Sequence, residues 1–170
     1  MTLDEFNALS ESQARSELLR CCGSRRWALE MSARRPFGNF NELIDAAAKF
    51  WTSLAPNDWK EAFSHHPKIG DIKSLRKKFA ATAQWAEGEQ AGVTQTSEKV
   101  LKELAEGNRL YEAKFGYIFI VCATGKSAEE MLTLLKIRLN SVPADELKIA
   151  IGEQAKITRI RLEKLLDQVV

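Results

Sequence analysis

Residues 39–54 read NFNELIDAAAKFWTSL, and this stretch carries the pattern that decides the fold. It opens with Asn39 and has Glu42 three residues later, a spacing typical of the capping box that starts a helix. The apolar residues that follow recur at helical spacing on one face: Leu43, Ile44, Ala47, Phe50, Trp51 and Leu54. The stretch therefore predicts an amphipathic helix that packs against a core.

Similar signals recur along the chain. Capping boxes are expected at Thr2–Glu5, Ser10–Gln13 and Ser127–Glu130. A helix after Ser10 should run to about Cys22, where Gly23 stops it, and a long helix should start at Thr94 or Ser97. Helices are expected at residues 2–8, 10–22, 25–34, 39–54, 56–63, 72–79, 94–111, 127–139 and 141–165.

The last expected helix should bury one stripe of side chains: Leu147, Ile151, Ala155, Thr158, Leu162 and Leu165. Residues 115–123 form the one β-like run, which is too short to make a sheet by itself. The sequence thus predicts an all-α protein, a single-domain helical bundle of about seven to nine helices over residues 1–170.

Composition narrows the class of protein. The chain has 170 residues, 45% hydrophobic and 28% charged, as is ordinary for a soluble globular domain. Its 25 basic and 23 acidic residues are too balanced to predict a nucleic-acid or anionic membrane partner. No apolar run approaches the roughly 20 residues of a membrane helix, and the N-terminus shows no secretory signal. The odd set Cys21, Cys22 and Cys122 does not form a disulfide framework, so a reducing, cytoplasmic setting is expected.

Residues 64–71, SHHPKIGD, hold both histidines of the chain. Pro67 lacks an amide hydrogen and pushes His66 out of the helical region, so a helix should end here with His66 extended. Imidazole has an unperturbed pKa of about 6.5, which suits a proton carrier. The alternative is simple capping and surface chemistry; His65 is expected to be structural or exposed.

Three further segments could carry chemistry, each with a plainer alternative. Glu89 and Gln90 lie on a glycine-bracketed turn and could orient a polar ligand, or could be surface groups. Residues 119–123 could offer backbone groups to a flat heterocycle, or could be an extended core segment. Arg161 lies near the apolar stripe of the last helix and needs an anionic partner, either a substrate or a structural carboxylate such as Glu153 or Asp145.

Metal and triad chemistry are not expected. The two histidines are adjacent, and no HxxxH, CxxC or GxSxG pattern occurs. The basic run Lys73, Arg76, Lys77 and Lys78 is typical of a solvated helix face, although phosphate binding remains an alternative. Cofactor-free acid–base chemistry is left, with a non-catalytic helical binding module as its rival.

Four motifs resemble the 2-oxo-4-hydroxy-4-carboxy-5-ureidoimidazoline (OHCU) decarboxylase family. They are HPKIGD at 66–71, EQAG at 89–92, FIVCATGKS at 119–127 and KITRIRL at 156–162, in the family's order. The resemblance implies an all-α and commonly homodimeric enzyme of urate degradation in purine catabolism. It implies conversion of OHCU, a small-molecule substrate, to (S)-allantoin and CO2 without a cofactor.

The resemblance also implies roles for individual residues. His66 would be the catalytic acid and base, Glu89 its partner across the substrate, and Arg161 rather than Arg159 the arginine that faces the substrate. The binding wall would comprise Pro67, Ala86, Glu87, Gly88, Gln90, Phe119, Ile120, Val121, Cys122 and Ala123. Many members carry Ser where this chain has Ala86, so no side-chain hydroxyl contact is expected there. A hydrolase that uses His66 and Glu89 to activate water is a second enzymatic alternative.

Overall fold

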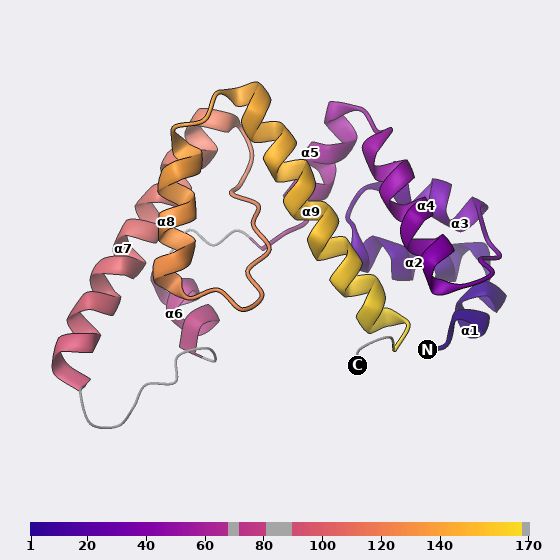
Figure 1. Ribbon diagram of the computed structural model, residues 1–170, viewed down its shortest axis with the longest axis horizontal. Coiled ribbons are helices and arrows are strands. Elements are labelled where there is room, and N and C mark those ends of the chain that lie inside the picture. Colours follow the sequence, from indigo (N-terminus) through magenta and orange to yellow (C-terminus); the bar gives the residue numbers. More distant parts are fainter. Residues whose placement is uncertain (68–71, 81–89, 168–170) are drawn as a thin grey trace. The chain divides into compact units, whose positions relative to one another are not determined.

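The computed structural model describes residues 1–67, 72–80 and 90–167, and their side chains apart from those of residues 78–80 and 90–97. The described residues form nine α-helices and no β-strand (Figure 1). The helices are α1 (Leu3–Ala8), α2 (Glu11–Cys21), α3 (Arg25–Ala33), α4 (Phe40–Thr52), α5 (Pro56–Ser64), α6 (Ile72–Ala80), α7 (Gln90–Phe115), α8 (Ala128–Leu139) and α9 (Pro143–Leu165). The predicted all-α, single-domain class is confirmed. Within it, contacts divide the chain into two compact units: unit 1, Met1–His66 with Ala150–Val170, and unit 2, Pro67–Ile149.

In unit 1, indole groups tie successive helices together. Trp27 on α3 is fully buried and donates a 3.1 Å hydrogen bond from Nε1 to the carbonyl of Ala47 on α4. Trp51 on α4 donates from Nε1 to the carbonyl of Ile151 on α9 at 3.0 Å. Because a buried indole N–H needs an acceptor, these bonds fix how α3, α4 and the second half of α9 pack around the core.

Unit 2 contains α7 and α8 side by side, with α6 against α7 (Figure 1). The connection from α7 to α8 contains the predicted β-like run, and residues 118–123 are neither helical nor in a strand. Within it, Ile120 and Cys122 are buried while their neighbours are half-buried, which is the alternation of an extended segment with one face on a core. A strand needs a partner, and among the described residues none pairs with this segment.

The predicted capping boxes form at Thr2, Ser10 and Ser127. Of the capping box predicted at Asn39, only the contact made by the Asn39 side chain forms. Asn39 accepts a hydrogen bond from the amide of Glu42 at 3.0 Å, but the Glu42 carboxylate accepts from the amide of Gly38 instead. The loop before Asn39 turns its own amide toward that carboxylate, so the return contact is made one residue earlier.

One predicted helix boundary was also wrong. The long helix starts at Gln90, not at Thr94 or Ser97, so Gln90 begins a helix instead of lying on a turn. Later residues of this helix, such as Leu104, are buried, and such packing overrides the weak local preferences that predicted a later start. The end of α2 agrees with the prediction: the helix ends at Cys21, Cys22 is its cap with an extended backbone, and Gly23 follows.

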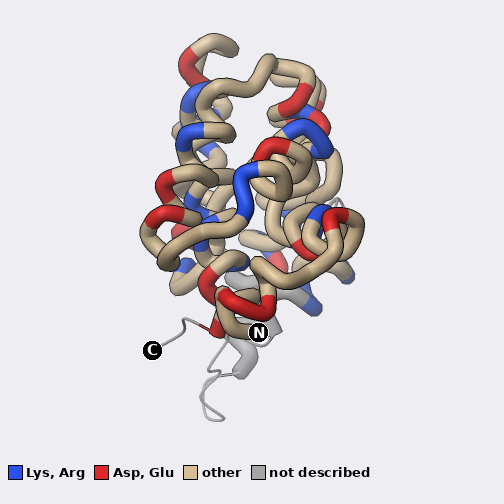
Figure 2. Tube along the Cα trace, turned by 90° about the vertical axis from the view of Figure 1, so that its right-hand side faces the viewer, with Lys and Arg blue, Asp and Glu red and all other residues tan. Residues whose placement is uncertain are grey.

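Basic and acidic residues are interspersed along the described helices (Figure 2). Arg76, within the predicted basic run, pairs with Glu98 of α7 at 2.6 Å, and Lys136 of α8 pairs with Glu103 at 2.8 Å. The basic run is therefore balanced in part by acidic groups of the neighbouring helix. None of the described helices combines the length and apolarity needed to cross a membrane.

Candidate active site

His66 lies directly after the end of α5. The helix ends at Ser64, and the amides of His65 and His66 donate to the carbonyls of Ala62 and Phe63, each at 3.2 Å. The predicted break before Pro67 is therefore confirmed. His66 is half-buried, whereas His65 is exposed, with its Nδ1 2.9 Å from the carbonyl of Glu61.

The imidazole of His66 meets a buried amide on α9. Its Nε2 lies 2.5 Å from Oε1 of Gln154, a side chain that is completely buried. The amide nitrogen of Gln154 in turn donates to Oγ1 of Thr158 at 3.1 Å, one helical turn further along. This pair of contacts holds the histidine ring on the inner face of α9 within unit 1.

Gln154 was missed by the sequence reasoning because the predicted stripe of α9 was partly wrong. The buried residues of α9 fall on every fourth position: Glu146, Ala150, Gln154, Thr158 and Leu162. Four members of the predicted stripe, Leu147, Ile151, Ala155 and Leu165, are only half-buried. A hydrophobic pattern assigns Glu146 and Gln154 to solvent, but a polar residue in register with Thr158 and Leu162 was a signal that could have found Gln154.

Arg161 lies further along α9 and reaches the end of α2. Its Nη1 donates to the carbonyl of Cys21 at 3.3 Å, so it satisfies one of the last carbonyls of that helix. The expected carboxylate partners were wrong: Glu153 pairs with Lys156, and Asp145 is exposed. A positive charge suits this place because the C-terminal end of a helix carries partial negative charge.

The environments of Arg159 and Arg161 bear on which of them could face a substrate. Arg159 is exposed and pairs with Glu163 on its own helix at 3.0 Å. Arg161 is half-buried and lies three residues after Thr158, so it follows Gln154 and Thr158 along one side of α9. Arg161 therefore extends from the side of α9 that carries Gln154 and Thr158, and His66 contacts the same side through Gln154.

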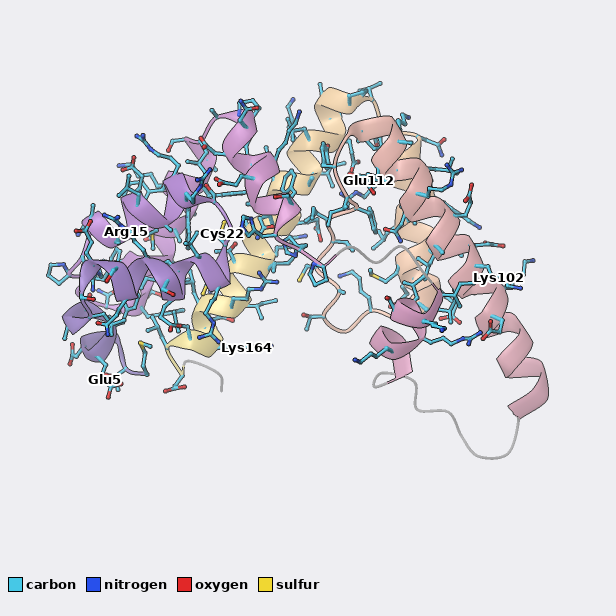
Figure 3. All side chains as sticks on the ribbon, turned by 180° about the vertical axis from the view of Figure 1, so that it is seen from behind. Glu5, Arg15, Cys22, Lys102, Glu112 and Lys164 are labelled. Carbon is cyan, nitrogen blue, oxygen red and sulfur yellow. The ribbon has the colours of Figure 1, made fainter. Side chains whose placement is uncertain are left out.

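Two thiols lie beside this face. Figure 3 shows Cys22 at the end of α2, facing α9, and its side chain is hydrogen-bonded to Thr158. Burial raises the pKa of Cys22 to about 11 and that of Cys21 to about 12, against the smaller lowering effect of Arg161. Both thiols therefore stay protonated at neutral pH and are poor nucleophiles.

In unit 2, the extended segment 119–123 is anchored by two cations. Arg138 of α8 donates from Nη1 to the carbonyl of Ile120 at 2.6 Å, and its guanidinium lies 4.5 Å from the ring centre of Phe119. Lys126 donates from Nζ to the carbonyl of Cys122 at 2.8 Å. The backbone of the predicted wall is thus held in place by side chains outside it.

The remaining predicted residues are placed only in part. Ala86, Glu87, Gly88 and Glu89 lie outside the described residues, and so does the side chain of Gln90. Pro67 is exposed, and it belongs with the 119–123 segment to unit 2, whereas His66 and Arg161 belong to unit 1. Within the described part of the chain, no three His, Cys, Asp or Glu side chains are grouped so that they could hold a metal ion.

Comparison with known proteins gives a consistent result. A profile of the OHCU decarboxylase family matches residues 7–163. The chain is 41% identical over 149 residues to the uric acid degradation bifunctional protein TTL of Arabidopsis thaliana, covering 86% of this chain and 45% of that protein. It is 30% identical over 133 residues to the 2-oxo-4-hydroxy-4-carboxy-5-ureidoimidazoline decarboxylase of Amia calva, covering 78% of this chain and 75% of that protein. It thus spans less than half of the Arabidopsis protein and three quarters of the Amia protein.

Solved structures agree in fold. A crystal structure of OHCU decarboxylase in the presence of (S)-allantoin superposes with a TM-score of 0.72 at 41% identity, over 89% of this chain and 97% of that chain. A crystal structure of (S)-allantoin synthase has the same fold, with a TM-score of 0.70 at 17% identity, over 98% of this chain and 55% of that chain. The profile match covers nearly the whole chain, including His66, Gln154 and Arg161. The chain therefore belongs to the OHCU decarboxylase family.

Proposed function

We propose that this protein decarboxylates OHCU to (S)-allantoin and CO2 in the degradation of urate, with His66 as the group that transfers the proton. The observation that carries the proposal is the placement of His66, a half-buried imidazole held by a buried amide in a chain of this family. A histidine so held can present a proton to a ligand from a fixed direction.

The chemistry needs no electron sink from outside the substrate. In OHCU one ring carbon carries both a hydroxyl and a carboxylate, and the next carries the ureido group. When the carbon–carboxylate bond breaks, CO2 leaves and its electron pair forms a double bond to the ureido-bearing carbon, while the π pair of the adjacent imine-like bond moves to the ring nitrogen, which takes up a proton. The ureido-bearing carbon then gains a proton while the hydroxyl loses one, which gives the carbonyl of allantoin.

The enzyme's task is therefore to orient the substrate and to deliver that proton to one face. The ureido-bearing carbon is planar before protonation, so protonation from either side would give a racemic product. One histidine on one side is enough to set the S configuration. Glu89 is proposed to face His66 across the substrate, and Arg161 to stabilise developing negative charge.

The same assignment extends to the binding wall. Pro67, residues 86–90 and residues 119–123 are proposed to line the substrate site. The carbonyls of Ile120 and Cys122 are held by Arg138 and Lys126, which supports this role for residues 119–123. A backbone that is already held in place can offer its other N–H and C=O groups to a ligand without reorganising.

The test is turnover of freshly prepared OHCU, followed by the circular dichroism of allantoin. We expect CO2 and (S)-allantoin to form faster than in the enzyme-free blank. A racemic product, or a rate equal to the blank, would contradict the proposal. A different product would favour the hydrolase, and a salt-sensitive complex with a polyanion in the absence of turnover would favour the binding module.

His66→Ala should lower kcat by about 100-fold or more, because it removes a general acid and base. His65→Ala is the matched control, since His65 is exposed and lies next to it in the chain. Equal rates for the two variants would remove His66 from the mechanism. Urea denaturation of both variants shows whether the fold is kept.

Assembly as a homodimer and a cytoplasmic location are proposed as well. Ile137 and Val142 of unit 2 are apolar and 62% and 58% exposed, and burying them in a subunit interface would be favourable. All three cysteines lie among the described residues and are thiols, which suits a reducing compartment. Sedimentation equilibrium would test the dimer: a monomer at micromolar concentration would contradict it.

A further inference from the structure

Resting on the proposed function, we infer that Gln154 is the positioning residue for His66: it keeps a proton on Nε2 of the imidazole and thereby assigns proton transfer to Nδ1. The two atoms concerned, His66 Nε2 and Gln154 Oε1, are 2.5 Å apart. A carbonyl oxygen can only accept a hydrogen bond, so the ring nitrogen facing it must be the donor.

The orientation of the Gln154 amide is set from its other side. Its nitrogen donates to Oγ1 of Thr158 at 3.1 Å. The hydroxyl of Thr158 also lies beside the thiol of Cys22: burial raises the pKa of that thiol, and Thr158 acts in the opposite direction. Because the amide nitrogen of Gln154 is engaged by Thr158, its amide oxygen is the atom that faces His66.

Burial makes this arrangement difficult to reverse. Gln154 is completely buried and Thr158 is 6% exposed. A buried amide that loses a partner costs about 1–3 kcal/mol, because no water replaces the missing hydrogen bond. The contacts from Cys22 through Thr158 and Gln154 thus act together on the ring of His66, and all four residues lie in unit 1.

The consequence for catalysis is directional. Because Nε2 donates to Gln154 in both the neutral and the protonated imidazole, the proton that is gained and lost in turnover is the one on Nδ1. The ring is also prevented from rotating, so Nδ1 keeps one direction relative to α9. Histidine in water interchanges its two neutral forms, and Gln154 removes this freedom.

The chain is well suited to a direct test, because it has only two histidines. Protein labelled with ¹⁵N-histidine gives two imidazole spin systems, and His65→Ala assigns them. We expect His66 to be the pure Nε2–H form when neutral, with a downfield Nε2–H proton that exchanges slowly with water. A Nδ1–H form, or a mixture of both neutral forms, would overturn the inference.

Three variants separate positioning from a general loss of structure. Gln154→Leu should lose the protected proton and lower kcat about tenfold, with KM little changed, because the reacting group is misplaced while the substrate contacts remain. Gln154→Glu keeps an acceptor of the same length and should restore the proton signal. Thr158→Val removes the contact that orients the amide and should give a mixture of His66 forms, whereas Thr158→Ser should not.

The spectrum is recorded without substrate, so this inference and the proposed function can fail separately. A protected Nε2–H in a protein that does not turn over OHCU would leave the orientation of His66 standing and refute the function. If the wild type turns over OHCU but its spectrum lacks the protected Nε2–H, the proposed function stands and the orientation of His66 is refuted. Full kcat in Gln154→Leu, with the proton signal lost, would show that the contact does not position His66 for catalysis.

Discussion

Arg138 and Glu146 form an ion pair inside unit 2, with Nη2 and Oε1 2.6 Å apart and side chains that are 7% and 0% exposed. The hydroxyl of Tyr111 also donates to this carboxylate, and burial together with that hydrogen bond raises the pKa of Tyr111. Arg138 extends from α8 to the carbonyl of Ile120 as well. One guanidinium thus joins α7, α8, the start of α9 and the extended segment 119–123.

Replacing Arg138 by Met should lower the free energy of unfolding by about 3–5 kcal/mol, because it leaves the Glu146 carboxylate buried without its cation. Urea denaturation followed by circular dichroism measures the loss. Arg159→Met is the matched control: Arg159 is 60% exposed, and its pair with Glu163 should contribute less than about 1 kcal/mol. Equal losses for the two variants would contradict the argument.

The helices could be predicted because their signals are local. Ser10 and Ser127 cap helices through contacts within three residues, and Pro67 ends one through its own ring. Such signals depend on the neighbouring sequence alone, so they need no knowledge of the fold. His66 was found for the same reason, as a histidine before a proline at the end of an apolar stripe.

The partners of the site residues could not be predicted, because they depend on tertiary contacts. Arg161 was expected to need a carboxylate, but it binds backbone carbonyls of α2, which are about 140 positions away in the chain. Gln154 is polar, and no hydrophobic pattern places it in a core. It can be buried because His66 and Thr158 satisfy its amide with hydrogen bonds. The segment 119–123 has the composition of a strand but does not pair with a strand among the described residues.

Gly107 should not tolerate a larger residue, because α7 and α8 approach closely there. A Cβ at this position would lie 2.6 Å from Cδ2 of the fully buried Leu135. Gly107→Ala should therefore destabilise the protein by about 1–3 kcal/mol through overpacking, despite the better helix propensity of Ala. Gly152→Ala in α9 meets nothing within 4 Å and should instead add about 0.5–1 kcal/mol. Urea titration of both variants tests the pair, and a shift of the same sign in both would contradict the close approach.

The thiols of Cys21 and Cys22 should make the protein less stable at high pH. Their pKa values are raised by burial to about 12 and about 11, from an ordinary value of 9.0. Since the folded state favours the neutral thiol, this contribution is complete below about pH 9 and is lost as the pH rises toward 11–12. The free energy of unfolding should fall more between pH 8 and pH 10 in the wild type than in a variant with both cysteines replaced by Ala.

Labelling provides a second measurement on the same thiols. In a Cys122→Ala background, a thiol-specific reagent at pH 8 should modify Cys21 and Cys22 slowly in the folded protein and rapidly in urea. Rapid labelling of the folded protein would show that the two thiols are accessible and ionised, contrary to their burial.

Gly23 should be required for the position of the histidine turn. A Cβ on Gly23 would lie 2.5 Å from both Cβ and Cγ of His65, so Gly23→Ala must displace the backbone next to His66. If His66 carries the reaction, we expect kcat to fall about tenfold or more, since small displacements of a reacting group are costly. The double variant Gly23→Ala with His65→Gly removes the atoms that clash and should recover most of the rate. If kcat recovers in the double variant and is unchanged in His65→Gly alone, the fall in kcat is caused by the close approach of Gly23 and His65. If kcat stays low in the double variant, the cause lies elsewhere in the turn.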